Sequence, residues 1–139
     1  TALSGDELQH YLLQIGATEL YSHIILPGFV SWKDLPWWYS GAVAFLYVSL
    51  REGFGIPVLE SMACGTPVLT SSISSMPEVA GPNGLLVDPF MPDQIADWLL
   101  RLETDEQLRE TQSRYGLERA TRFSWRKSAG KVLDLYNQL

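Results

Sequence analysis

The stretch from Ala42 to Thr70 decides the fold, and it reads AVAFLYVSL (42–50), REGFGIP (51–57), VLESMACG (58–65) and TPVLT (66–70). The first block is continuously apolar rather than alternating, which predicts a strand covered on both faces, as in a parallel sheet. A glycine-rich turn follows, and Pro57 is typical of the first turn of a helix, which we expect to end at Gly65. The last block predicts the next strand. A strand, a helix and a strand in this order indicate a parallel pair joined by a right-handed crossover.

The flanking sequence continues this alternation. Ser4 and Glu7 have the spacing of a capping box, which predicts a helix of about three turns that stops at Gly16. Further strands are predicted over 23–26 and 84–87. Other helices are predicted from Ser31 or Asp34 to Ser40, and over 74–79, 92–103, 105–121 and 125–138, the last capped by Ser124. The pattern predicts a single α/β domain over 1–139, with a parallel sheet of about four strands and flanking helices.

Composition excludes several classes of protein. The chain has 139 residues, of which 46% are hydrophobic and 19% charged, which suits a folded domain and not a disordered acidic tail. A net charge of −6 argues against nucleic-acid binding, because that binding depends on clustered cations. The single cysteine, Cys64, is predicted to be a small buried residue. The apolar run 42–50 is too short to span a bilayer, and the first residues do not resemble a signal peptide.

The loop over 49–56 is the predicted binding site. It follows the most apolar strand, and ligands of parallel sheets bind outside the carboxyl ends of the strands. Gly53 and Gly55 allow the backbone to approach a ligand closely. The helix that starts near Ile56 directs free N–H groups and the positive end of its dipole outward, which suits a phosphate. The glycines do not match the dinucleotide fingerprint, which needs a third glycine.

Two carboxylates flank this loop, Glu52 within it and Glu60 about one turn into the helix. Carboxylates beside a phosphate would repel it, so we expect them to accept hydrogen bonds from hydroxyls. A sugar ring and a ribose are the obvious sources. Taken alone, the pair also fits a simpler interpretation, in which both are solvated acids favoured by the helix dipole.

The residues from Glu52 to Val68 resemble the signature of the group 1 family of retaining glycosyltransferases. The likeness extends over residues 28–30, 34–36, 74–81, 84–89 and 123–125, and therefore covers nearly the whole chain. Members of this family have two Rossmann-like domains around a cleft, the GT-B-like arrangement. The resemblance implies that residues 1–139 form a partial Rossmann-like domain from the C-terminal half, which binds the nucleotide-sugar donor.

The resemblance also implies a role for each residue of the motif. Glu52, the candidate catalytic residue, would contact hydroxyls of the donor sugar, and Glu60 would hold the ribose hydroxyls. Backbone amides would contact the rest of the donor. The residues concerned are Phe54, Gly55 and Ile56 for the sugar, with Gly53 in the same loop, Val58 and Leu59 for the diphosphate, and Phe29 and Val30 for the base.

Two features of the family are missing from the sequence. The family's acceptor domain has no room in 139 residues, and its Arg and Lys that neutralise the leaving diphosphate lie before the first residue. Lys33 and Arg51 are the only cations of residues 1–100. No Asp-x-Asp pattern occurs, so we expect no metal site and no cofactor. We expect a UDP-, GDP- or ADP-sugar as the donor, transfer with retention in the complete enzyme, and an inactive isolated chain.

Two other functions stay open. One is a non-catalytic nucleotide-sugar binding or assembly module. The other is a nucleotide-sugar epimerase, which needs a general acid or base in reach, and His10 and His23 are poorly placed for that role. The expected location is cytoplasmic, with peripheral membrane association of the full-length enzyme as an open alternative.

The edges of the predicted sheet suggest how the chain assembles. By the resemblance, two strands precede this chain, and in the order 3-2-1-4-5-6 they occupy the sheet centre. The strands predicted over 23–26 and 43–48 would then have unpaired edges, which favour pairing with another chain. We expect self-association or a companion segment that completes the sheet. Candidate contacts are Trp37, Trp38 and Tyr39, with one of the two tryptophans buried.

Overall fold

The computed structural model describes residues 3–138. The chain divides into two compact units, residues 1–35 and residues 36–139, and each is described by itself. That residues 1–139 act as a single domain stays a prediction.

The first unit is built around helix α1 (Gly5–Gln14), which packs against the 3-10 helix η1 (Thr18–His23). The predicted capping box is confirmed: the Glu7 amide donates to Ser4 Oγ at 3.2 Å, and the Ser4 amide donates to Glu7 Oε2 at 2.8 Å. Leu8 and Leu12 are buried on one face of α1. Local hydrogen bonds therefore fix the start of the helix, and two leucines form its buried face.

The strand predicted over 23–26 is wrong. His23 ends the 3-10 helix η1, and no sheet pairing involves Ile24–Leu26 within residues 3–138. All three apolar residues are exposed, with Ile25 at 80%. A short β-branched run before Pro27-Gly28 also suits an extended connection, and only a pairing partner makes it a strand. The sheet consequently has three strands rather than about four.

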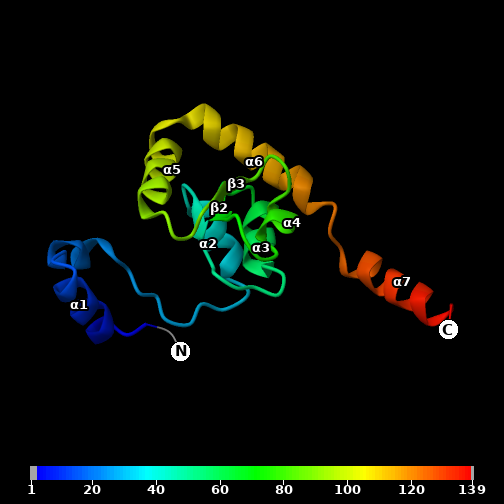
Figure 1. The fold of residues 1–139 in the computed structure, drawn as a ribbon, viewed down its shortest axis with the longest axis horizontal. Helices are drawn as coiled ribbons and strands as arrows, with labels where there is room; N and C mark the ends of the chain where they lie inside the picture. The colour runs from blue at the N-terminus through cyan, green and yellow to red at the C-terminus, as the bar shows by residue number, and fades with distance from the viewer. Residues whose placement is uncertain (1–2, 139) are drawn as a thin grey trace. The chain divides into compact units, whose positions relative to one another are not determined.

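The second unit contains a parallel sheet of β1 (Phe45–Tyr47), β2 (Val68–Ser71) and β3 (Leu85–Val87), in the order β1-β2-β3 (Figure 1). In register, Phe45 pairs with Val68 and Leu69 pairs with Leu85. All four residues of β2 are buried. The α/β fold with a parallel sheet and flanking helices is confirmed, with β2 at its centre.

Strand β1 is shorter than the predicted 42–50 and is not covered on both faces, because Leu46 is 40% exposed. Within the described residues, β2 is the strand that pairs with β1, so the other edge of β1 is open. An edge position explains both differences, since such a strand has a pairing partner on one side only. The predicted self-association or companion segment stays a prediction.

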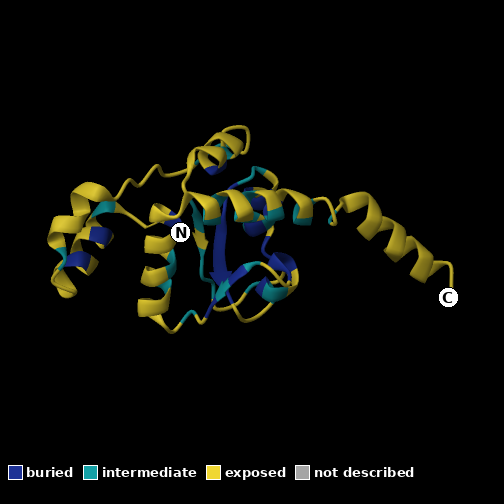
Figure 2. Ribbon diagram, turned by 90° about the horizontal axis from the view of Figure 1, so that it is seen from above, coloured by how far each residue is buried: buried dark blue, intermediate teal, exposed yellow. Residues whose placement is uncertain are grey.

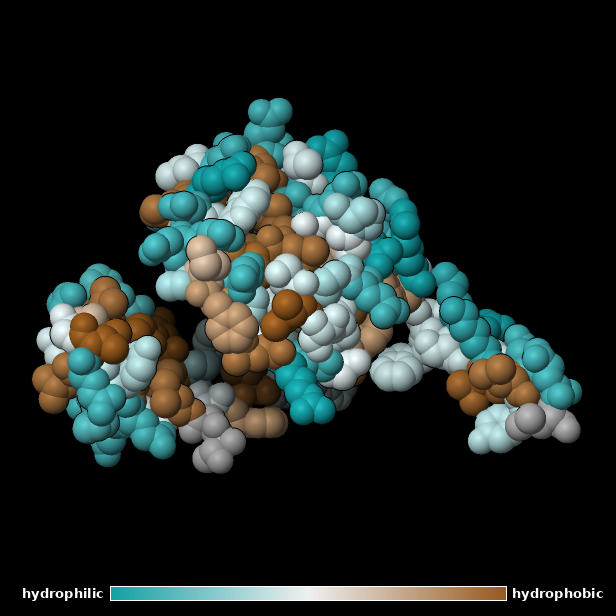
Figure 3. Space-filling view, viewed as in Figure 1, coloured by the Kyte–Doolittle hydropathy of each residue, from teal (hydrophilic) through white to brown (hydrophobic). Residues whose placement is uncertain are grey.

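Among the described residues, six helices follow the first unit or begin at its last residue, and their bounds lie close to the predicted ones. They are α2 (Leu35–Gly41), α3 (Ile56–Ala63), α4 (Met76–Ala80), α5 (Pro92–Thr104), α6 (Glu106–Ala120) and α7 (Trp125–Tyr136). The predicted cap of α7 is confirmed, because Ser124 Oγ accepts a hydrogen bond from the Lys127 amide at 3.1 Å. Residues 125–138 are exposed throughout (Figure 2). Hydrophobic side chains show on α7 (Figure 3), where Val132, Leu133 and Leu135 are exposed.

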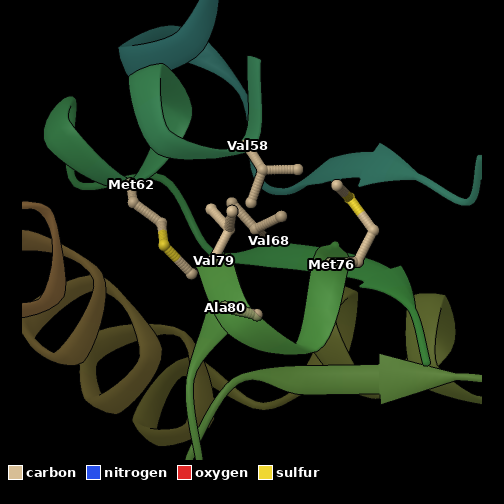
Figure 4. Close-up of a cluster of buried hydrophobic side chains, with 6 residues drawn as sticks. All are labelled: Val58, Met62, Val68, Met76, Val79 and Ala80. Carbon is tan, nitrogen blue, oxygen red and sulfur yellow. The ribbon is translucent and has the colours of Figure 1, made fainter. Parts of the chain in front are cut away.

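Two hydrophobic clusters lie on opposite faces of the sheet. Neighbouring residues of a strand point to opposite faces, so Val68 and Leu69 of β2 belong to different clusters. Helices α3 and α4 supply the first cluster, which consists of Val58, Met62, Val68, Met76, Val79 and Ala80 (Figure 4). In the second cluster, Leu102 of α5 packs on Leu69, Leu85 and Val87. The buried strand β2 thus joins the two halves of the core.

Helix α2 orients its aromatic residues differently from the prediction. Trp37 is 78% exposed and Trp38 is 51% exposed, whereas Tyr39 is buried. The expectation that one tryptophan is buried is therefore wrong, and Tyr39 is not a surface contact. The helix buries the tyrosine, which packs edge-on against Phe45 of β1 with ring centroids 5.2 Å apart. Among residues 3–138, no helix is long and apolar enough to cross a membrane.

Candidate functional site

The connection from β1 to α3 carries the predicted site. Gly55 precedes α3 in a left-handed conformation, with φ of +100°, and a Cβ placed there would collide with the Met76 side chain. Only glycine meets both demands. Gly53 has open space where a side chain would be. The loop is therefore fixed at Gly55 and open at Gly53.

The backbone amides of this connection fall into two groups. The Val58 and Leu59 amides both donate to the Gly55 carbonyl, at 3.1 and 3.3 Å. Within residues 3–138, the amides of Phe54, Gly55 and Ile56 donate no hydrogen bond. Free N–H groups at the start of a helix, near the positive end of its dipole, favour an anionic or oxygen-rich ligand.

Glu52 is held at its side chain and at its backbone. Tyr47 in β1 donates its hydroxyl to Glu52 Oε1 at 2.5 Å. The Ser74 hydroxyl accepts from the Glu52 amide at 3.1 Å and donates to the Glu52 carbonyl at 2.9 Å, and Ser75 donates to the same carbonyl at 3.2 Å. Ser74 has a φ of +59°, a conformation that costs about 1–2 kcal/mol in a residue other than glycine. The position of Glu52 is thus set by three neighbours.

Glu60 is exposed on α3, and its carboxylate Oε2 accepts a hydrogen bond from the Tyr39 hydroxyl at 3.2 Å. Burial, followed by the nearby charge of Glu60, raises the pKa of Tyr39 to about 12. The hydrogen bond to Glu52 is the main cause that raises the pKa of Tyr47 to about 12. Both phenols consequently stay protonated, and act as donors, at neutral pH.

A groove of about 780 Å³ lies beside the loop and α3. Its lining includes Phe54, Ile56 and Glu60, together with Arg122, Lys127 and Lys131 from the C-terminal segment. The Phe54 ring packs edge-on against Phe123, with centroids 5.7 Å apart. The groove therefore brings three cations of the C-terminal segment near the loop.

Two of the predicted site residues belong to the first unit. These are Phe29, which is 94% exposed, and Val30, which is half-buried. Their predicted contact with a base stays a prediction, as do the roles of the other site residues. Cys64 is half-buried, and burial raises the pKa of its thiol, which is the property of an unreactive cysteine. Across residues 3–138, no group of three or more metal-ligating side chains occurs.

Sequence reasoning missed four residues around the carboxylates, Tyr39, Tyr47, Ser74 and Ser75. Tyr47 was placed in an apolar strand, and Tyr39 at an interface. A usable signal exists for the tyrosines, because a phenol in a buried segment needs a hydrogen-bond partner. Ser74 and Ser75 lie 22 and 23 residues from Glu52, and no local pattern relates residues at that distance.

Comparison with known proteins now identifies the family. The family described as "Glycosyl transferases group 1" matches residues 3–137. The chain belongs to this family. The resemblance seen in the stretch from Glu52 to Val68 is thereby confirmed.

Individual relatives agree with this assignment. The O-antigen chain mannosyltransferase B of Escherichia coli is 37% identical over 134 residues, which are 96% of this chain and 35% of that protein. The solved C-terminal domain of the group 1 family protein LpcC from Francisella tularensis is 33% identical, with a TM-score of 0.69 over 84% of this chain and 60% of that one. The match covers about a third of the length of that mannosyltransferase and of the D-inositol 3-phosphate glycosyltransferase of Paenarthrobacter aurescens.

A more distant structure agrees in fold. The Anabaena protein HepE, solved in complex with UDP and glucose, has a TM-score of 0.83 at 22% identity, covering 96% of this chain and 37% of that protein. This likeness shows the fold alone. The α/β arrangement of this chain is therefore also found in the matching part of HepE.

Proposed function

We propose that this chain is the donor-binding part of a glycosyltransferase that moves a sugar from a nucleotide-sugar to an acceptor with retention. The observation that carries the proposal is the connection from β1 to α3. It combines three amides that have no partner among residues 3–138 with two carboxylates, Glu52 and Glu60, each of which accepts a hydrogen bond from a tyrosine hydroxyl. Mannosyltransferase and glycosyltransferase relatives support the same conclusion.

In this proposal, each group binds the part of the donor that suits its chemistry. Glu52 accepts hydrogen bonds from sugar hydroxyls, and Glu60 accepts them from the ribose, because ionised carboxylates are acceptors only. The loop amides face the sugar. The first turn of α3 faces the diphosphate, where the Val58 and Leu59 amides share their hydrogens with the Gly55 carbonyl. Phe29 and Val30 meet the base.

The acceptor site and the cations that stabilise the leaving diphosphate come, in this proposal, from the longer protein to which the relatives' lengths point. Charge that develops on a leaving phosphate needs fixed cations or a metal. The isolated chain therefore binds donor without turning it over. A cytoplasmic location belongs to the same proposal, and a single cysteine suits a reducing compartment.

Calorimetric titration with UDP-, GDP- and ADP-sugars, and with the matching nucleoside diphosphates, tests the proposal. Glu60→Ala should weaken the binding of both kinds of ligand by roughly 1.5–3 kcal/mol, because a hydrogen bond to a charged group is lost. Glu52→Ala should weaken the binding of the nucleotide-sugar and leave the binding of the nucleoside diphosphate nearly unchanged. Glu110→Ala, an exposed acid on α6, is the matched control. Unchanged binding in both site variants would contradict the proposal.

A further inference from the structure

Each candidate carboxylate is paired with a tyrosine from a different element. Tyr47 of β1 donates to Glu52 Oε1 at 2.5 Å, and Tyr39 of α2 donates to Glu60 Oε2 at 3.2 Å. One oxygen of each carboxylate is therefore occupied. The second oxygen, Oε2 of Glu52 and Oε1 of Glu60, has no protein partner within the described residues. The pairing thus leaves each carboxylate with one oxygen for a ligand.

The two tyrosines are themselves anchored in the same way. Thr70, in β2, donates its hydroxyl to the Tyr47 carbonyl at 2.7 Å. Thr66, just before β2, donates its hydroxyl to the Tyr39 carbonyl at 2.6 Å. Both threonines are buried, with exposures of 0% and 2%. Because both donor side chains are buried, losing these hydrogen bonds would be costly, so the backbones of both tyrosines are fixed to β2 and to the segment that leads into it.

Ring packing restricts the tyrosine side chains further. Phe45 packs edge-on against Tyr39, with centroids 5.2 Å apart, and stacks on Tyr47, with centroids 5.8 Å apart. One phenylalanine therefore touches both tyrosine rings. Because the rings are held by packing and the backbones by the threonines, the two hydroxyls are fixed points in the protein.

We propose that Tyr47 and Tyr39 are positioning residues, which hold Glu52 for the sugar and Glu60 for the ribose. This inference rests on the proposed function. A free glutamate side chain samples several rotamers, and ordering it on binding costs free energy. A carboxylate already held by a fixed phenol avoids part of that cost, which is the general benefit of preorganisation.

Tyrosine-to-phenylalanine variants test the inference, because they remove the hydroxyl and keep the ring that packs on Phe45. The two ligands to be compared are the nucleotide-sugar that binds most tightly, among the UDP-, GDP- and ADP-sugars, and its nucleoside diphosphate. Tyr47→Phe should lower the affinity for the nucleotide-sugar about threefold to tenfold and leave the affinity for the nucleoside diphosphate unchanged. Tyr39→Phe should weaken both by the same factor, and should not affect the 2′,3′-dideoxynucleoside diphosphate, which lacks the ribose hydroxyls.

Tyr115→Phe is the matched control. The Tyr115 hydroxyl donates to the Ala80 carbonyl at 2.8 Å and accepts from the Asn83 amide at 3.3 Å, so its removal reports the loss of tyrosine hydrogen bonds away from the carboxylates. This variant should lower the melting temperature and leave the ratio of the two ligand affinities unchanged. A Tyr47→Phe variant that weakens both ligands equally would behave like this control, and would overturn the positioning role.

A double-mutant cycle separates this inference from the proposed function. In the Glu52→Ala background, Tyr47→Phe should have no further effect on nucleotide-sugar binding, because its target is gone. If Glu52→Ala weakens binding and Tyr47→Phe does not, the positioning role is wrong and the proposed function stands. If Glu52→Ala and Glu60→Ala change nothing, or no nucleotide-sugar binds the unaltered chain, the proposed function itself fails.

Discussion

The centre of the chain and its two ends are stabilised in different ways. Among the described residues, ten hydrophobic side chains between Val58 and Leu102 are buried on the two faces of the sheet, and Tyr39 of α2 is also buried. The ten are Val58, Met62, Val68, Leu69, Met76, Val79, Ala80, Leu85, Val87 and Leu102. In residues 3–35, Leu8 and Leu12 are the buried hydrophobic residues, and residues 125–138 are all exposed.

The ends are nevertheless helical, because their sequences contain strong local signals. Ser4 caps α1 and Ser124 caps α7. A side-chain cap satisfies one of the free amides at a helix start and typically contributes about 1 kcal/mol. Local signals can thus define a helix without burying it. The centre, by contrast, is defined by contacts between distant segments, and this contrast predicts where substitutions will be costly.

The largest expected effect comes from Leu69→Ala in β2. Leu69 is fully buried between β3 and α5, and truncating such a leucine costs about 2–5 kcal/mol of unfolding free energy. Leu133→Ala on α7 is the matched control, since Leu133 is 60% exposed, and it should change stability by less than about 0.5 kcal/mol. Urea denaturation measures both. Equal losses in the two variants would contradict the contrast between centre and ends.

An effect no larger than that of Leu69→Ala is expected from Gly55→Ala in the loop. The left-handed backbone costs about 1–2 kcal/mol for alanine, and the contact with Met76 adds about 1–3 kcal/mol of overpacking. Gly53→Ala, in the same loop, has open space around the added carbon and should be nearly neutral. Thermal melting of the two variants compares them directly. A Gly55→Ala protein as stable as Gly53→Ala would show that the loop is less constrained than its packing indicates.

Much of the fold was predictable from the sequence, for physical reasons that particular residues illustrate. The helix starts at Ser4, Pro57 and Ser124 depend on neighbours three residues away or fewer, and a single sequence contains that information. The strand over 23–26 was not predictable, because a strand exists only when another segment pairs with it. The length of β1 and the burial of Tyr39 also depend on contacts with segments that are distant in the sequence.

In the candidate site, too, the contacts within a local motif were predictable and the contacts between distant segments were not. Glu52, Gly55 and Glu60 belong to one continuous motif, so their proximity follows from the loop and the first turns of α3. Ser74, Ser75 and Tyr39 reach this motif from 21 to 23 residues away. Sequence spacing has no rule for such contacts. The parallel sheet brings Ser74 and Ser75 to the motif by placing successive loops at one edge, and the packing of α2 on β1 brings Tyr39.

The smallest expected effect is a pH dependence confined to the centre, at Tyr39 and Tyr47. Their pKa values are raised to about 12 in the folded chain, against about 10 for an unperturbed phenol. Below pH 10 both the folded and the unfolded chain hold these protons. Between pH 10 and 12 the unfolded chain releases them while the folded chain retains them, so stability falls as pH rises. Urea denaturation at pH 9 and pH 11 measures this loss.

The double variant Tyr39→Phe/Tyr47→Phe removes both phenols, and it should lose less stability than the unaltered chain over the same interval. An identical decline in both proteins would assign the alkaline sensitivity to other groups and would show that the two phenols are not held in the folded state.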